Sequence, residues 1–195
     1  MVAVVITLVA VFLITRQVVW CWPLSMVGVT LYSVVFFEAR LYADMGLQGL
    51  YFALAAYGWW AWLHGGEDHG ALRVSQASAK TKAALLAGAT IAGLTLGYAL
   101  SRFTDASLPF MDSSLTTFSI AAQWMQTRKL LENWLLWLAV DVLYVSMFLY
   151  MELYLTAALY AGFLILAVMG YVQWRRSWRL SMMGSELSPS GEAAS

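Results

Sequence analysis

Long apolar stretches, separated by short polar segments, run along most of the chain. A helix needs about 20 mostly apolar residues to cross the hydrocarbon core of a bilayer. Seven stretches approach or reach this length, and we expect transmembrane helices over residues 1–15, 20–38, 42–63, 83–101, 108–126, 133–151 and 154–174. The pattern therefore predicts an all-α polytopic membrane protein.

The polar segments differ in length and character. The longest lies between the third and fourth spans, from residue 64 to residue 82, and we expect a loop there. From residue 179 the chain becomes rich in Ser, Gly and Glu, which predicts a disordered cytoplasmic tail over residues 179–195. The apolar N-terminus has no basic leader and no small-residue cleavage site before Arg16, so we expect a first span there and not a cleavable signal peptide.

Composition supports a lipid environment. Hydrophobic residues make up 62% of the chain and charged residues 11%, whereas about 25% of residues are charged in an ordinary soluble domain. The net charge is zero, which gives no reason to expect a nucleic-acid partner. Cys21 is the single cysteine and cannot form an intrachain disulfide. The expected partners are therefore the bilayer and a small molecule.

Basic residues are unequally divided between the two sides of the expected spans. Arg40 and Arg102 fall on one side, and the other nine fall on the opposite side: Arg16, Arg73, Lys80, Lys82, Arg128, Lys129, Arg175, Arg176 and Arg179. Because cytoplasmic loops of membrane proteins carry the excess of Lys and Arg, the second side is expected to be cytoplasmic. Seven spans then place the N-terminus outside and the C-terminus in the cytoplasm.

The chain also contains an internal repeat, visible when it is shifted by 112 residues. Matching pairs include Thr15/Thr127, Arg16/Arg128, Trp22/Trp134, Tyr32/Tyr144, Phe36/Phe148, Gly58/Gly170 and Trp62/Trp174. Each repeat holds three spans and one span lies between them, so both repeats have the same orientation and an axis along the membrane normal relates them. The expected units are a first three-helix repeat (1–63), a cytoplasmic loop with a linker helix (64–107) and a second three-helix repeat (108–178), a 3+1+3 plan.

Several short motifs follow one another in a fixed order. They are Trp20-Cys21-Trp22-Pro23, Leu41-Tyr42-Ala43-Asp44 with Gln48, Tyr57-Gly58-Trp59-Trp60-Ala61-Trp62, Asn133-Trp134-Leu135-Leu136-Trp137 with Asp141, and Gly170-Tyr171-Val172-Gln173-Trp174. Together they resemble the bacterial PnuC-type nicotinamide riboside transporter family over about residues 1–178. The resemblance implies a SWEET-like 3+1+3 fold in the cell inner membrane. It also implies facilitated diffusion of an unphosphorylated vitamin or nucleoside, trapped by a cytoplasmic kinase.

The sixth span carries the most informative candidate site. Trp134, Trp137, Asp141, Tyr144 and Phe148 fall within about 80° of one another at 100° per residue. Aromatic faces suit a flat heterocycle and attract cations, and a carboxylate could balance a pyridinium or thiazolium charge. The alternatives are that the stripe is ordinary packing and that Asp141 is structural or relays protons.

Other spans add polar candidates. Thr116, Ser119 and Gln123 share a face of the fifth span, with Thr117 beside them. In the third and seventh spans, Gln48, Tyr51 and Tyr160 are expected to face the same axis. The repeat partners of Trp137 and Asp141 are Ser25 and Val29, so the second repeat is expected to supply more of the polar contacts. We therefore predict a substrate site formed by Gln48, Tyr51, Thr117, Gln123, Trp134, Trp137, Asp141, Tyr144 and Tyr160.

Two further groups of residues, the aromatic residues at span ends and the two histidines, are not expected to bind the substrate. Trp59, Trp60, Trp62, Tyr171 and Trp174 lie near cytoplasmic span ends, where an interfacial aromatic belt is the expected role and a gate the alternative. His64 and His69 have no second ligand cluster, so we expect no metal.

The sequence contains no P-loop, nucleophile elbow or CxxC motif, so we expect neither a cofactor nor an enzyme. The favoured function is uptake of nicotinamide riboside by a uniporter. Thiamine, riboflavin, a deoxynucleoside and proton coupling through Asp141 remain open, as does a homo-oligomer.

Overall fold

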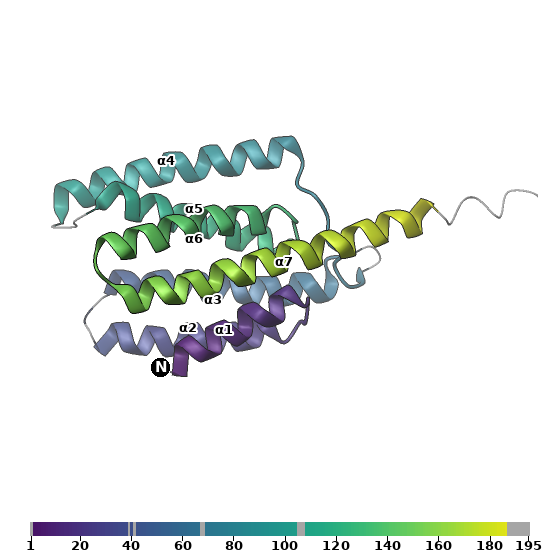
Figure 1. Cartoon of the computed structure of the whole chain (residues 1–195), viewed down its shortest axis with the longest axis horizontal. Helices are drawn as coiled ribbons and strands as arrows, with labels where there is room; N and C mark the ends of the chain where they lie inside the picture. The colour runs from purple at the N-terminus through teal and green to yellow at the C-terminus, as the bar shows by residue number, and fades with distance from the viewer. Residues whose placement is uncertain (1, 39, 41, 67–68, 105–107, 187–195) are drawn as a thin grey trace, which may run out of the picture.

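The computed structural model describes residues 2–38, 40, 42–66, 69–104 and 108–186 of the 195-residue chain. These residues form seven α-helices that run side by side in one bundle (Figure 1). They are α1 (Val2–Thr15), α2 (Cys21–Glu38), α3 (Tyr42–His64), α4 (Ala79–Phe103), α5 (Pro109–Thr127), α6 (Asn133–Tyr150) and α7 (Tyr154–Glu186). The all-α prediction is confirmed, and each expected span overlaps one helix.

Within the described residues, four helices have both the length and the apolar composition needed to cross a membrane, namely α2, α4, α6 and α7. Helix α1 is strongly apolar but has only 14 residues, which corresponds to about 21 Å at 1.5 Å per residue. Helix α5 is long enough, but Ser, Thr and Gln side chains interrupt its apolar character. Those side chains face α4 and the interior of the bundle, as described below.

Helix α4 lies along one edge of the bundle and packs against α5 (Figure 1). The two backbones approach closely because small residues of α4 face α5: a Cβ added at Gly93 would lie 2.9 Å from Thr117 Oγ1. Ser113 Oγ donates a hydrogen bond to the Gly93 carbonyl (2.9 Å), and Thr117 Oγ1 donates to the Ala89 carbonyl (2.9 Å). In a lipid bilayer the hydrophobic effect does not drive helices together, and close packing of small residues with interhelical hydrogen bonds stabilises their association instead.

The six remaining helices form two sets of three with corresponding neighbours. In the first set α1 packs against α2, and α2 packs against α3; in the second set α5 packs against α6, and α6 packs against α7. Contacts between the sets correspond as well, because α1 packs against α7 and α5 packs against α3. The turns correspond as well, since Gln17 (φ 58°) matches Lys129 (φ 48°) and Arg40 (φ 61°) matches Glu152 (φ 59°) at the 112-residue offset. A left-handed conformation is uncommon outside glycine, so its recurrence at matched positions is what a duplicated unit predicts.

Four tryptophans pack together between the helices, near the end of the bundle where α3 ends and α2 and α6 begin, and each is at most 1% exposed. Trp22 meets Trp62 edge to face at 5.3 Å, Trp134 meets Trp174 in the same way at 5.3 Å, and the Trp62 and Trp174 rings lie 5.8 Å apart. Trp62 and Trp174 are therefore buried between helices, so the expected role in an interfacial aromatic belt is wrong for them. It fits Trp59 and Trp60 better, because these side chains are 39% and 58% exposed.

The tryptophan cluster also joins the two sets of helices. Trp62 Nε1 on α3 donates to the Gln126 carbonyl of α5 (3.1 Å), and Trp174 Nε1 on α7 donates to the Ile14 carbonyl of α1 (3.1 Å). Donors and acceptors in these two bonds are related by the 112-residue offset, so each set donates to the other. Buried indole N–H groups usually have such partners. For Trp62 and Trp174 the partner lies in the opposite repeat, whereas Trp22 Nε1 and Trp134 Nε1 have no hydrogen-bond partner among the described residues.

The segment before α4 is fastened to the turn between α5 and α6. Lys129 Nζ donates to the Leu72 carbonyl (2.9 Å) and lies 4.4 Å from the centre of the Trp62 ring. The Ser75 amide donates to the Lys129 carbonyl, and Lys82 pairs with Glu132 at 3.2 Å. This part of the expected loop is thus held at the end of the bundle that contains the tryptophan cluster.

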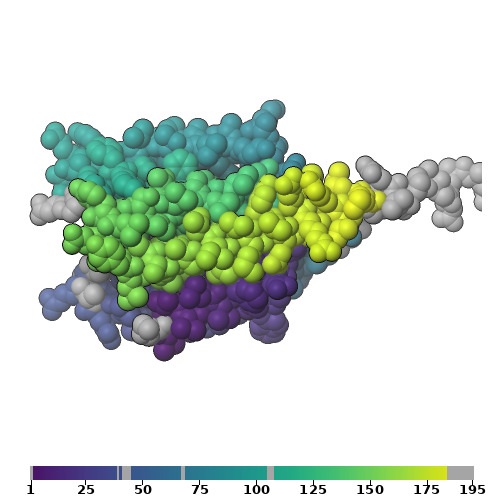
Figure 2. Space-filling model, viewed as in Figure 1, coloured from purple at the N-terminus to yellow at the C-terminus, as the bar shows by residue number. Residues whose placement is uncertain are grey.

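Helix α7 continues past the other helices to Glu186 and protrudes from the bundle (Figures 1 and 2). We expected disorder from residue 179, and this is wrong for residues 179–186, which are helical. The rest of the expected tail, residues 187–195, lies outside the described residues.

Candidate substrate-binding pocket

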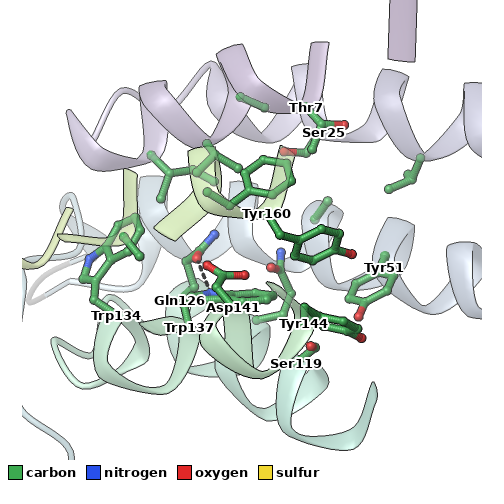
Figure 3. Close-up of a pocket in the computed structure, with 18 residues that line it drawn as sticks. Thr7, Ser25, Tyr51, Ser119, Gln126, Trp134, Trp137, Asp141, Tyr144 and Tyr160 are labelled. Atoms are coloured by element: carbon green, nitrogen blue, oxygen red, sulfur yellow. Dashed lines mark hydrogen bonds between the residues drawn. The ribbon is translucent and has the colours of Figure 1, made fainter. Parts of the chain in front are cut away.

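A cavity of about 270 Å³ lies between the two sets of helices (Figure 3). Most of its lining residues form pairs at the 112-residue offset: Thr7/Ser119, Val11/Gln123, Ile14/Gln126, Ser25/Trp137, Val29/Asp141, Tyr51/Phe163 and Ala55/Ala167. Ala10, Trp134, Tyr144 and Tyr160 complete the lining. The cavity is therefore built from matched positions of both sets of helices.

The two walls of the pocket differ in chemistry. At three of the matched positions α1 and α2 supply Val11, Ile14 and Val29, where α5 and α6 supply Gln123, Gln126 and Asp141. At a fourth position, Ser25 stands where the other repeat has Trp137. The polar groups therefore gather on the α5–α6 wall, so a solute with one polar edge has a preferred orientation.

Asp141 is the ionisable acid of this pocket. Its side chain is 4% exposed, and among the described residues it has no hydrogen bond or ion pair. None of the described residues that line the cavity is a Lys or an Arg. A carboxylate taken out of water is costly unless it is neutralised or paired, so the pocket suits a solute that brings a positive charge or hydrogen-bond donors.

Aromatic rings surround one end of the cavity. Tyr144 and Tyr160 lie 4.7 Å apart between ring centroids. Phe148 does not line the cavity but supports it from behind, stacked on Tyr144 at 5.8 Å with 10° between the planes. Tyr51 lines the same region (Figure 3). These flat faces can contact a heterocycle, and their π-electrons favour a cation.

The structure brings together seven of the nine residues that we predicted for the site. Tyr51, Gln123, Trp134, Trp137, Asp141, Tyr144 and Tyr160 all line the cavity, as does Ser119.

Three candidates lie elsewhere. Gln48 and Thr116 are half-buried and do not line the cavity. Thr117 faces α4, where its hydroxyl donates to Ala89. The polar side chains of α5 do not all face the cavity, because α5 also packs against α4. Hydroxyl groups on that side of α5 donate hydrogen bonds to backbone carbonyls of α4.

Gln126 is the main lining residue that sequence reasoning missed. It follows Ser119 and Gln123 at helical spacing on the same face of α5, so the stripe could have been extended by one turn. Phe163 could also have been found, because it is the repeat partner of Tyr51. Among the described residues, no three His, Cys, Asp or Glu side chains come together as a metal site.

Comparison with known proteins shows the family of the chain. Residues 1–176 match the family described as nicotinamide mononucleotide transporter. The chain is 27% identical over 180 residues to the nicotinamide riboside transporter PnuC of Escherichia coli (strain K12), covering 80% of this chain and 75% of that protein. It is 28% identical over 131 residues to the riboflavin/roseoflavin transporter RibM of Streptomyces davaonensis, covering 65% of this chain and 61% of RibM.

A solved structure shows the same fold. The crystal structure of the vitamin B3 transporter PnuC superimposes with a TM-score of 0.67 at 22% identity, covering 90% of this chain and 79% of that chain. The expectation of a multi-pass membrane transporter, and not an enzyme, is confirmed by the family match. The chain belongs to the nicotinamide mononucleotide transporter family, the PnuC-type transporters that its sequence resembles.

Proposed function

We propose that the chain carries nicotinamide riboside, or a closely related vitamin, into the cell by facilitated diffusion. The observation that carries this proposal is the Asp141 carboxylate, buried without an ion pair among the described residues in a cavity lined by aromatic rings. Nicotinamide riboside has a flat, permanently cationic pyridinium ring, which would supply the missing charge. Relatives named as nicotinamide riboside transporters support the same choice.

An unphosphorylated solute fits the pocket better than a nucleotide. The part of the cavity lining that the structure describes contains no Lys or Arg, and phosphate groups are normally bound by basic side chains or helix N-termini. Asp141 would repel a phosphate. Phosphorylation of the vitamin by a cytoplasmic kinase would then prevent its return and maintain the inward gradient.

All seven helices are proposed to cross the inner membrane in the 3+1+3 arrangement, with an axis along the membrane normal. The matched neighbours, left-handed turns and exchanged indole hydrogen bonds support this arrangement. The nine basic residues near one end of the bundle favour a cytoplasmic C-terminus. Transport would proceed by movement of one three-helix set against the other, which exposes the pocket to each side in turn.

Riboflavin is the main alternative substrate, because RibM is named as a riboflavin/roseoflavin transporter. Thiamine and deoxynucleosides are further alternatives within the same mechanism. Proton-coupled transport through Asp141 is the mechanistic alternative, since a carboxylate without a partner can also carry a proton.

Ligand binding to the purified protein in detergent distinguishes these substrates. We expect nicotinamide riboside to raise the thermal unfolding temperature, since a ligand that binds only the folded state stabilises it. The corresponding mononucleotide should bind far more weakly. Equal stabilisation by both would contradict an unphosphorylated substrate, and stabilisation by riboflavin alone would replace nicotinamide riboside with riboflavin.

A further inference from the structure

Gln126 is held at two points near the end of α5. Its side chain is 4% exposed and lines the cavity. Its backbone carbonyl accepts a hydrogen bond from Trp62 Nε1 (3.1 Å), and its side-chain Oε1 accepts one from Trp137 Nε1 (3.0 Å). Neither the backbone nor the amide group of this residue is therefore free to turn.

The bond from Trp137 fixes which way the amide points. An indole N–H is a donor only, so the atom 3.0 Å away must be the amide oxygen, and the amide nitrogen must take the other position. Among the described residues, that nitrogen has no hydrogen-bond partner. Its two N–H donors are therefore available to whatever occupies the cavity.

Asp141 supplies the complementary acceptor. It follows Trp137 by four residues on α6, about one helical turn or 6 Å along the axis, and Figure 3 shows both side chains directed into the pocket. The carboxylate is an acceptor without a donor among the described residues. One wall of the pocket thus presents a donor of fixed orientation on α5 and an acceptor on α6.

The facing wall cannot offer the same pair. The repeat partners of Gln126, Trp137 and Asp141 are Ile14, Ser25 and Val29. Ile14 and Val29 have no polar side-chain atom, and the small Ser25 leaves space where the other repeat has an indole. A ring that enters this space would direct its polar edge toward α5 and α6.

We propose that Gln126 and Asp141 together recognise a primary carboxamide on the ring of the solute. The carboxamide oxygen accepts from the Gln126 amide nitrogen, and the carboxamide N–H donates to Asp141. Trp137 is a positioning residue, because its indole N–H keeps the Gln126 donors pointing into the cavity. This inference rests on the proposed function and adds to it a means of selection between solutes that differ in a single group.

A ring carboxylate in place of the carboxamide tests this selection. Nicotinic acid riboside differs from nicotinamide riboside by an oxygen anion where the amide has NH₂, and that anion would face Asp141. A site built to hydrogen-bond one group rejects an analogue that leaves its buried groups unpaired or repelled. Isothermal titration of the full-length protein in detergent should therefore show at least tenfold tighter binding of the amide.

Two variants separate recognition from positioning. Gln126→Glu keeps an acceptor for Trp137 but replaces the free donors with an oxygen, and it should weaken binding of nicotinamide riboside at least tenfold. Trp137→Phe keeps an aromatic ring but removes the N–H, so the Gln126 amide can turn and the preference for amide over acid should shrink. Trp60→Phe is the matched control, because Trp60 is 58% exposed and should leave both affinities unchanged.

The outcomes separate this inference from the proposed function. Equal binding of amide and acid by the unaltered protein would overturn the inference and leave the transporter assignment intact. Loss of affinity for both ligands by the same factor in Trp137→Phe would overturn the positioning role, since it would show that the indole only stacks. Binding of neither compound would overturn the proposed substrate together with the inference.

Discussion

The close contact between Gly170 and Trp134 leads to a quantitative prediction. A Cβ added at Gly170 would lie 2.5 Å from three ring carbons of Trp134, about 1 Å inside an ordinary contact. The ring is 1% exposed and is packed against Trp174, so it has little room to move. Overpacking of this kind costs about 1–3 kcal/mol, while alanine gains about 1 kcal/mol over glycine in a helix.

Gly162 provides the control on the same helix, because a Cβ there would meet nothing within 4 Å. Gly162→Ala should therefore be neutral or slightly stabilising, and Gly170→Ala should be less stable than it by about 1–3 kcal/mol, because the helix gain is common to both variants and only the overpacking cost differs. For a chain of this size, that difference corresponds to roughly 2–12 °C in the unfolding midpoint. Thermal unfolding in detergent, followed by the loss of the monodisperse peak on gel filtration, measures it.

A double variant tests the cause of the effect. Trp134→Phe removes ring atoms that the new methyl group would strike, so Gly170→Ala should cost less in that background. Gly58→Ala should behave like Gly170→Ala, because a Cβ at Gly58 would lie 2.6 Å from the Trp22 ring. Equal unfolding midpoints for Gly170→Ala and Gly162→Ala would refute the close packing and the matched role of the two glycines.

Three further predictions concern charge and space. Asp141→Asn should weaken binding of nicotinamide riboside by about tenfold or more, as expected for a lost charged contact. Its effect on riboflavin binding should be much smaller, and an equal loss of affinity for both ligands would contradict the counter-charge role of Asp141. Ser25→Trp should fill the space where the other repeat has Trp137 and abolish ligand binding, whereas Val27→Trp, at a side chain that is 49% exposed, should not; binding that survives Ser25→Trp would place the ring elsewhere. Burial lowers the pKa of Lys129 from 10.5 to about 8, so the unfolded state holds more protons between these values, and the free energy of unfolding should rise with pH there relative to Lys129→Met; parallel pH profiles would contradict a buried ammonium group.

The positions of the helices could be predicted from sequence because apolar length and polar breaks are local properties. Helix α6 begins at Asn133, as expected, and its stripe of Trp137, Asp141 and Tyr144 reaches the cavity because helical periodicity alone places those side chains on one face. The 112-residue repeat was visible for the same reason, since matched residues need no knowledge of contacts.

The errors arose where a second partner decides the outcome. Thr117 and Gln126 both lie on α5, and only the position of α4 shows that Thr117 faces away from the cavity. Trp62 and Trp174 were expected near the membrane surface, but each indole N–H finds a carbonyl in the opposite repeat and the ring is buried. Such partners are separated by 64 and 160 residues in the chain, a relation that local patterns do not contain.

Counterflow in liposomes tests the central claim most directly. Purified protein is reconstituted with unlabelled nicotinamide riboside inside, and labelled nicotinamide riboside is added outside, without ATP or an ion gradient. A uniporter that binds this vitamin should accumulate the label transiently, and Asp141→Asn liposomes should accumulate much less. The absence of counterflow under these conditions, followed by uptake only when a proton gradient is imposed, would contradict facilitated diffusion.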